Sequence, residues 1–406
     1  MTTSDSRSPT SVRDAPSTSA FVFFALAVIA GGGAANVYYH QPLLGQLLAA
    51  FGPSAPTLIA TATLLGYGLG ILLLVPLGDT WPRRTLIVTQ QLVLAAALAA
   101  SAIAPSLAML TVVSVVVGTF ATTAQQAIPL AAELAPPHER GRVVGRAMTG
   151  LLLGVLLSRT FSGAVAHAYG WRFVFAAAAG VALIFAILAA VFLPRTQPTS
   201  KLRYPALLAS VFALVREEPV LRWATLTQGC NFAAFNVLWA CLVLHLSHAP
   251  FNLGPASAGL FGLVGAAGAI VAPFAGRLAD RHGSRKVVIS GTVLVLLSFG
   301  LFGTLGSTSL IGIGVGVLVL DIGVCLAMVA NQTRVYALRP EARGRLNTVF
   351  MTGAFASGGL GAMLGTRSFE LGGWIPVCAL GAIFGACAIA AACATPSRRA
   401  TGALPQ

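Results

Sequence analysis

Charged residues are scarce in this chain, and their scarcity excludes an ordinary soluble protein. Lys, Arg, Asp and Glu make up 9% of the 406 residues, whereas the apolar set makes up 56% and the mean hydropathy is +0.84. An average soluble domain carries about a quarter charged residues. Because so few charges cannot cover a soluble surface of this size, the apolar runs are expected to face lipid.

Cysteine and histidine are equally sparse, which argues against a disulfide framework, a metal and a cofactor. The six cysteines all fall inside apolar runs, where a small buried thiol is the simplest interpretation. His245 and His248 are three residues apart, but no carboxylate or thiolate lies nearby in the sequence to complete a metal site. Glycine-rich runs at 66–70 and 312–316 lack the spacing of a nucleotide-binding loop, so close helix packing explains them.

Long apolar runs separated by polar breaks predict twelve membrane spans in an all-α protein. The first run could be mistaken for a signal peptide, but eleven more follow it, so we interpret it as an uncleaved first helix. The predicted spans lie near 21–39, 57–76, 86–103, 107–128, 145–165, 173–194, 222–244, 256–275, 286–305, 309–330, 347–366 and 374–394.

The distribution of Lys and Arg predicts the orientation, because these residues are retained in cytoplasmic loops. Of the 25 Lys and Arg residues, 22 lie on one predicted side, and the exceptions are Arg159, Arg172 and Arg367. We therefore expect a multi-pass protein of the cell inner membrane with both termini in the cytoplasm. The net charge of +14 then reflects topology and contact with anionic lipid headgroups, not binding of nucleic acid.

Three landmarks recur at an offset of 203 residues and indicate an internal duplication. They are Arg140-Gly141-Arg142 with Arg343-Gly344-Arg345, Gly170-Trp171 with Gly373-Trp374, and Pro137 with Pro340. Six spans per copy is an even number, so the copies share one orientation, as in the parallel repeats of transporters. The expected division is a tail at 1–20, a six-helix bundle at 21–194, a cytoplasmic linker at 195–221, a second bundle at 222–394 and a tail at 395–406. A short amphipathic helix is expected at 206–215 in the linker.

The loop between the eighth and ninth spans carries a motif that resembles the signature of a transporter family. Residues 276–286 read GRLADRHGSRK, which closely resembles the loop signature of the major facilitator superfamily. The matching loop of the first copy departs from it: Val75 stands in place of the leading glycine and Pro82 in place of the second glycine, so its turn should differ. The resemblance implies twelve helices in two parallel six-helix bundles that move a solute by alternating access.

The charged residues of the two matching loops predict a gate. An Asp at a helix end can accept hydrogen bonds from the N-terminus of a neighbouring helix, and the arginines that follow can reach that Asp or anionic lipid. In proteins that this chain resembles, such a cluster is taken to stabilise one access state. The predicted gating residues are Asp79, Arg83, Arg84, Gly276, Asp280, Arg281, Gly283, Arg285 and Lys286.

Two charged residues are predicted near the middle of the bilayer, where charge is costly and usually functional. Arg159 and Asp321 each lie 13 residues from a basic residue at the cytoplasmic end of their span, about 20 Å above that edge. Because they come from opposite copies, we hypothesise that they pair in one access state and separate in another. Asp321 could then take up a proton, because an unpaired buried carboxylate is easier to protonate. A static ion pair that fixes helix packing is the alternative.

Polar and aromatic side chains in the first, fourth, seventh and tenth spans predict the substrate cavity, since those spans line it in the proteins that this chain resembles. Each amide has an alternative role in a hydrogen bond between helices. The candidates are Asn36, Tyr38, Gln125, Gln126, Gln228, Asn231, Asn236, Trp239 and Asn331, with Gln332 beside the last.

A secondary active transporter is therefore the leading interpretation, with protons as the coupling ion and a small organic molecule as the substrate. The mostly amide, aromatic and aliphatic cavity favours efflux of a drug-like compound or metabolite by proton antiport. Uptake of a small organic anion neutralised by Arg159 is the alternative. A membrane-embedded enzyme would need a nucleophile and a base at one depth, which the spans lack, and a receptor would not need two gating loops. We expect no enzyme activity and a monomer.

Overall fold

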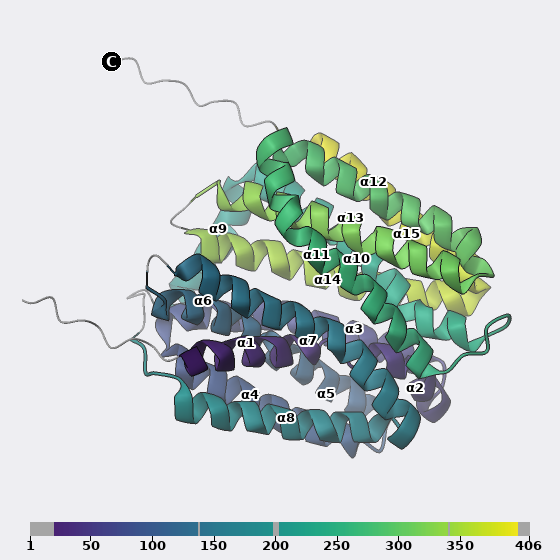
Figure 1. Cartoon of the computed structure of the whole chain (residues 1–406), viewed down its shortest axis with the longest axis horizontal. Coiled ribbons are helices and arrows are strands. Elements are labelled where there is room, and N and C mark those ends of the chain that lie inside the picture. The colour runs from purple at the N-terminus through teal and green to yellow at the C-terminus, as the bar shows by residue number, and fades with distance from the viewer. Residues whose placement is uncertain (1–19, 137–138, 198–202, 340–341, 397–406) are drawn as a thin grey trace, which may run out of the picture.

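The chain forms an all-helical bundle in a computed structural model that describes residues 20–136, 139–197, 203–339 and 342–396 (Figure 1). The first half contains α1 (Ala20–Ala35), η1 (Gln41–Leu43), α2 (Leu44–Phe51), α3 (Ser54–Thr80), α4 (Arg83–Ala102), α5 (Leu107–Phe120), η2 (Ala121–Thr123), α6 (Ala124–Leu134), α7 (Arg140–Tyr169) and α8 (Trp171–Phe192). After α9 (Tyr204–Glu217), the second half contains α10 (Pro219–Ser247), α11 (Pro255–His282), α12 (Ser284–Gly303), η3 (Leu305–Ser307), α13 (Leu310–Tyr336), α14 (Arg343–Gly372) and α15 (Trp374–Ala394).

The helices occupy the positions of the twelve predicted spans. Within the described residues, ten helices are long and apolar enough to cross a membrane, with α5 to α6 counted as one. The shorter α1 and the long α11 take the two remaining positions. The start of α1 and the end of α15 lie at one end of the molecule, together with the turn between α3 and α4. We call this the motif end and the other the opposite end.

The first span is shorter than predicted, since α1 ends at Ala35 and not near residue 39. The backbone N–H groups of residues 36 to 38 bond three residues back, and the Asn36 amide donates to the Gly32 carbonyl at 2.7 Å. That side chain competes with the backbone for a helical acceptor. Pro42, which cannot donate a backbone bond, opens η1. Residues 36–40 therefore form turns that carry polar side chains into the interior.

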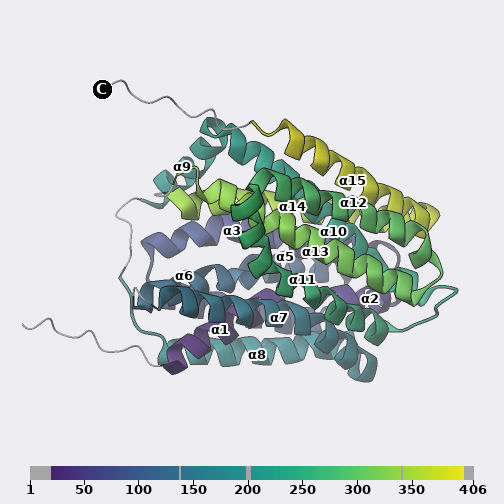
Figure 2. The same ribbon diagram turned by 45° about the horizontal axis from the view of Figure 1, so that its top comes forward.

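Each half packs its helices in the same pattern, as the duplication predicts. α1 packs on α7, α3 on α5 and α4 on α8, and the second half repeats this with α10 on α14, α11 on α13 and α12 on α15 (Figure 2). A matched pair of contacts supports the correspondence: Arg84 donates to the Ala190 carbonyl, and Arg285 donates to the Cys393 carbonyl at 2.6 Å. Each arginine ties the third helix of its half to the end of the sixth.

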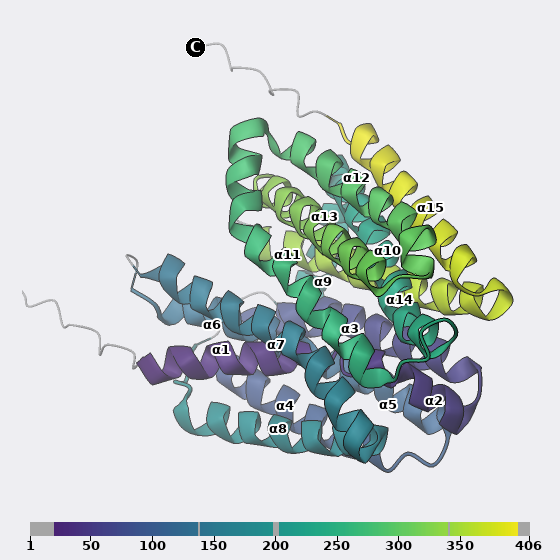
Figure 3. The same ribbon diagram turned by 45° about the vertical axis from the view of Figure 1, so that its right-hand side comes forward.

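The two halves meet along two seams, α3 with α14 and α7 with α11, and the contact is not equal at the two ends of the molecule. α3 and α14 contact one another from Thr57 with Thr366 at the opposite end to Gly68 with Thr352 near the middle of α3. α7 and α11 meet at the opposite end and diverge toward the motif end (Figure 3). η1 and α2 add contacts to α10 at the opposite end. The halves are therefore joined more fully at the opposite end.

Glycine residues let the backbones of α1 and α7 approach closely, and this packing can be tested by substitution. A Cβ atom at Gly154 would overlap the backbone of Gly31, whereas one at Gly180 of α8 would meet no atom within 4 Å. Gly154→Ala should therefore destabilise the protein by about 1–3 kcal/mol through overpacking. Thermal unfolding in detergent should show a lower melting temperature for Gly154→Ala and no loss for Gly180→Ala. Equal melting temperatures would contradict this packing.

A candidate transport site between the two halves

Arg159 is buried where the two halves meet, and aromatic rings surround its guanidinium. Its exposed fraction is 4%. The Cζ atom lies 4.1 Å from the ring centroid of Trp239 on α10 and 4.6 Å from that of Tyr38, distances that suit cation–π attraction. The Nε atom donates to Oε1 of Gln41 at 2.7 Å. Residues of both halves thus share one cation.

Local features of the sequence build this environment. The break after α1 brings Tyr38 and Gln41 inward, and the Ser162 hydroxyl holds the turn by donating to the Tyr39 carbonyl at 2.5 Å. On the other side, a Cβ at Gly262 of α11 would lie only 3.1 Å from the Cβ of Arg159. Gly262 therefore lets α11 pack directly against the arginine stem.

Asp321 of α13 is the second deep charge, and it does not form an ion pair with Arg159 in this structure. Electrostatic interaction links the two side chains, but the described part of the chain provides neither an ion pair nor a hydrogen bond to the carboxylate. Oδ2 is buried without a partner there, while the residue as a whole is partly exposed. The hypothesis of a pair that forms in another state stays a prediction.

A continuous aromatic seam runs from Arg159 across the interface. We use this name for Tyr38, Tyr67, Phe232, Phe235, Trp239 and Phe355. Ring centroids are 4.3 Å apart for Tyr67 with Phe355, 4.7 Å for Phe355 with Phe232, and 6.1 Å for Phe235 with Trp239. Tyr67 lies on α3 and Phe355 on α14, so the seam joins the halves with apolar faces.

The predicted cavity amides fall into two groups. Gln228 and Asn331 are buried, and neither side chain has a hydrogen-bond partner among the described residues. Trp239 likewise keeps its indole N–H without an acceptor there. Buried polar groups without partners are costly in a static core, so these three side chains suit contact with a polar solute.

The remaining amides make contacts within the protein. Asn231 donates to the Thr292 hydroxyl of α12 at 3.1 Å, a bond between helices of one half. Asn236 donates to the Phe232 carbonyl of its own helix at 2.8 Å. A side-chain hydrogen bond links Gln125 to Tyr67 in the aromatic seam. Their role in substrate binding stays a prediction.

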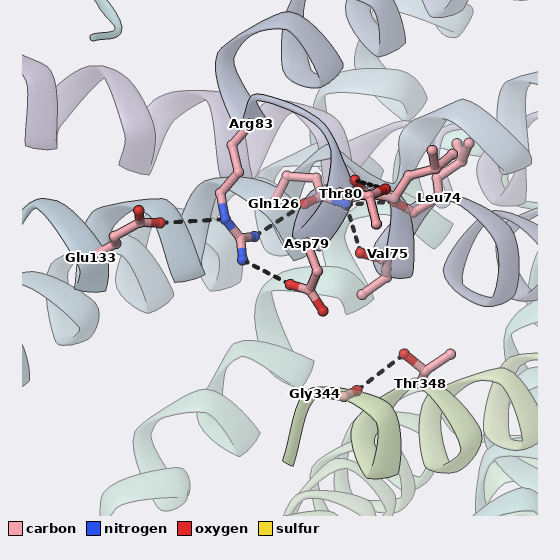
Figure 4. A network of polar contacts seen from close by, with 10 residues as sticks. Leu74, Val75, Asp79, Thr80, Arg83, Gln126, Glu133, Gly344 and Thr348 are labelled. Carbon is pink, nitrogen blue, oxygen red and sulfur yellow. Dashed lines mark hydrogen bonds and ion pairs between the residues drawn. The ribbon is translucent and has the colours of Figure 1, made fainter. Parts of the chain in front are cut away.

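Gln126 belongs to a polar network at the motif end, centred on Arg83 (Figure 4). The Arg83 guanidinium lies 3.3 Å from Asp79, 3.2 Å from the Gln126 carbonyl oxygen and 3.5 Å from Glu133, distances between N and O atoms. The Gln126 amide donates in turn to the Leu74 carbonyl at 2.7 Å. Both ends of this side chain are thus engaged in the motif-end network, a place that differs from the cavity predicted for it.

Two residues of α3 make room for this network. A Cβ at Gly78 would collide with the Gln126 amide, so glycine permits the close contact. Pro76 lacks an N–H and disturbs the last turns of α3. Side chains bond to carbonyls of the preceding turn: Gln126 to Leu74, and Tyr204 of α9 to Leu73 at 2.8 Å. The linker helix is thereby anchored to the first half.

Asp79 also faces the second half. Its carboxylate points toward the N-terminal turn of α14 at Gly344, and Arg345 interacts with it electrostatically. The N-terminus of a helix carries partial positive charge, which favours a carboxylate there. The sequence predicted that a motif aspartate could accept hydrogen bonds from such a helix end; that interaction and its role in gating stay predictions.

The second copy of the motif turns differently, as the sequence predicted. Gly283 has φ of +86°, whereas Pro82 at the corresponding place has φ of −59°. Arg281 and Lys286 are exposed, and Gly276 has no atom within 4 Å of a Cβ position. The side chain of Asp280 lies outside the described residues. α9 forms at Tyr204–Glu217, where a short helix was expected.

Sequence reasoning missed several residues that the fold brings to these sites. Glu133 is seven residues after Gln126 on the same helical face, a spacing that could have revealed it. Phe232 and Phe235 lie at a similar helical spacing before the predicted Trp239 on α10. Gly262 carries no local signal, because its importance comes from a side chain in the other half.

The architecture and the motif agree with a match to a family model. The model described as Major Facilitator Superfamily matches residues 19–267 and 224–405. The chain belongs to the major facilitator superfamily. It is therefore a multi-pass membrane transporter and not an enzyme.

Relatives and solved structures agree with this membership. The chain is 41% identical to the uncharacterized transporter YgaY of Escherichia coli K12, covering 88% of this chain and 91% of that one. It is 33% identical to the transporter SCO4007 of Streptomyces coelicolor, with coverage of 86% and 81%. Identity is 26% to the chloramphenicol efflux pump MT0201 of Mycobacterium tuberculosis CDC 1551, with 72% of each chain covered. The fold is similar to those of the nucleoside transporter NupG (TM-score 0.72, 12% identity, 92% and 98% coverage) and a bacterial Spinster homologue (TM-score 0.69, 16% identity, 92% and 94% coverage).

The motif network predicts unequal effects for two carboxylates of the same loop region. Glu133 faces Arg83, whose side chain is 13% exposed, while Glu139 pairs with Arg142, which is 69% exposed. Glu133→Gln should destabilise the protein by about 1 kcal/mol, because a mostly buried cation loses a partner. Glu139→Gln should cost less than about 0.5 kcal/mol, as expected for an exposed pair. Thermal unfolding of both purified variants tests this, and equal shifts would contradict it.

Proposed function

We propose that this transporter exports a small organic solute from the cytoplasm in exchange for protons, by alternating access. In this proposal the protein lies in the cell inner membrane and its motif end faces the cytoplasm. The heavy bias of Lys and Arg toward the loops of that end supports the orientation. The observation that carries the mechanism is the unequal contact of the halves around Arg159.

The unequal seams support a state closed at the periplasmic end. At that end Thr57 bonds to Thr366, and nearer the centre Arg159 lies between Trp239 and Tyr38. At the cytoplasmic end, α7 and α11 diverge, and Asp79 of α3 faces the N-terminal turn of α14. Rocking of one half against the other about the central site would open the periplasmic end and close the cytoplasmic one.

Asp321 is the proposed proton carrier. It is the only carboxylate near the middle of the described spans, and it has no hydrogen-bonding or ion-pairing partner among the described residues. Its place in the second half, opposite Arg159 in the first, means that rocking changes the separation of the two charges. A change in that separation alters how readily the carboxylate holds a proton. This couples protonation to access.

Efflux is favoured over uptake by the chloramphenicol efflux pumps among the relatives, at 26% identity. The alternative is uptake of an organic anion neutralised by Arg159. An exporter lowers the amount of solute that accumulates in the cell, whereas an importer raises it. Chloramphenicol is therefore the first probe to use, and its accumulation in cells with and without the protein distinguishes the two directions.

A cysteine pair tests alternating access directly. The hydroxyl oxygens of Thr57 and Thr366 are 2.6 Å apart and belong to different halves. In a background without native cysteines, Thr57→Cys with Thr366→Cys should form a disulfide that abolishes transport, because the periplasmic ends can no longer separate. Reduction should restore transport. Each single variant is the matched control and should transport under both conditions. Full activity of the cross-linked protein would contradict alternating access at this seam.

Substitution of Asp321 tests the proton coupling. In proteoliposomes with an imposed pH gradient, wild-type flux of chloramphenicol should rise with the gradient. Asp321→Asn, which is nearly isosteric, should lose this dependence but still exchange solute across the membrane. Glu139→Gln removes an exposed carboxylate and should behave as wild type. An unaltered response of Asp321→Asn to the gradient would exclude Asp321 as the proton carrier.

A further inference from the structure

Arg159 and Asp321 are the only charged residues near the middle of the described spans, and they carry opposite charges. One comes from α7 in the first half and the other from α13 in the second. Other charges of the described helices, such as those of Arg83, Arg334 and Glu370, lie near helix ends. The interior between the halves therefore offers one cation and one anion.

Each of these charges keeps an unused polar atom. Nη2 of Arg159 and Oδ2 of Asp321 are buried and have no hydrogen-bond partner among the described residues. Nε bonds to Gln41, and the rings of Trp239 and Tyr38 lie over the guanidinium. A donor and an acceptor thus remain available, and they are held by separate elements.

Charge balance restricts what can bind between them. A solute with one charge would pair with one of these atoms and leave the other without a partner, which is costly in a low-dielectric interior. A neutral solute such as chloramphenicol could pack on the aromatic seam but would pair with neither charge, so it should bind more weakly than a zwitterion. A solute that carries both a carboxylate and an ammonium group can compensate both at once. The aromatic seam beside Arg159 then suits an apolar or aromatic body.

We propose that the transported solute is a zwitterion, with its carboxylate on Nη2 of Arg159 and its ammonium group on the carboxylate of Asp321. This assignment deepens the proposed function and rests on it. An ammonium group and a proton cannot occupy the Asp321 carboxylate together. Binding of the solute therefore releases the proton, and protonation releases the solute. That competition is sufficient for antiport without a second site.

Three compounds of matched size and different charge test the proposal. L-phenylalanine is a zwitterion, 2-phenylethylamine is its cation counterpart, and 3-phenylpropionate is its anion counterpart. L-leucine adds a zwitterion with a smaller body. Binding to the full-length protein in detergent is measured near neutral pH. At least one of the two zwitterions should bind wild type at least tenfold more tightly than the amine and the acid.

Single substitutions should reverse this preference in opposite ways. Asp321→Asn removes the anion, so 3-phenylpropionate should bind as well as L-phenylalanine or better. Arg159→Gln removes the cation, so 2-phenylethylamine should bind as well as L-phenylalanine or better. A merely structural role would weaken all compounds alike. Such equal weakening, or equal binding of the charged compounds by wild type, overturns the proposal.

Cys325 provides a second measurement that does not depend on transport. It lies one turn from Asp321 on α13 and is partly exposed. In a variant that keeps only this cysteine, a bound zwitterion should slow its reaction with a maleimide at least severalfold. Asp321→Asn should lose this protection while its melting temperature shows that it is folded. If neither zwitterion binds or protects, the proposal fails. Proton-coupled flux of chloramphenicol would then still stand, so the two failures can be told apart.

Discussion

A guanidinium buried between the two halves is the interaction on which the rest of this interface depends. Taking such a charge out of water costs several kcal/mol unless neighbouring groups compensate it. Here the compensation comes from Gln41 and Tyr38, which follow α1 in the first half, and from Trp239 on α10 in the second. The early end of α1 brings Tyr38 and Gln41 inward, and Gly262 lets α11 pack against the stem of Arg159. The same cation leaves one donor unused, and Asp321 leaves one acceptor.

The duplicated scaffold and the unduplicated charges have different physical origins. Each half must hold six helices together, and so both use the same helix pairs and the same tie between an arginine and the end of the sixth helix, at Arg84 and at Arg285. The unduplicated charges lie at the two seams: Asp79 of α3 faces α14, and Arg159 lies where α7 meets α11. The two seams therefore differ in their polar contacts.

Features that depend on the local sequence were predicted well, whereas features that depend on a distant neighbour were not. The motif aspartate at position 79 was expected at a helix end, and it lies in the last turn of α3. Arg159 and Asp321 were singled out by counting residues along a helix, and the fold brings one from each half near the other. Gln126 looked like a cavity residue because its span lines the cavity, but its rotation about the helix axis turns it toward Arg83. Periodicity predicts which residues share one face of a helix. Only the neighbouring helices decide whether that face meets a cavity or another polar network.

The sequence by itself determined the number of helices, the duplication, the two unequal loops and the family of transporters to which the chain belongs. The first three follow from composition, apolar run length and repeated landmarks, and the family is indicated by the resemblance of residues 276–286 to its loop signature; each of these features is local or periodic along the chain. The tertiary structure decided which polar atoms are left without partners, how Phe355 and Tyr67 extend the aromatic seam, and that Arg159 contacts rings instead of Asp321. Those outcomes depend on distances between helices that are far apart in the sequence, and packing alone sets such distances.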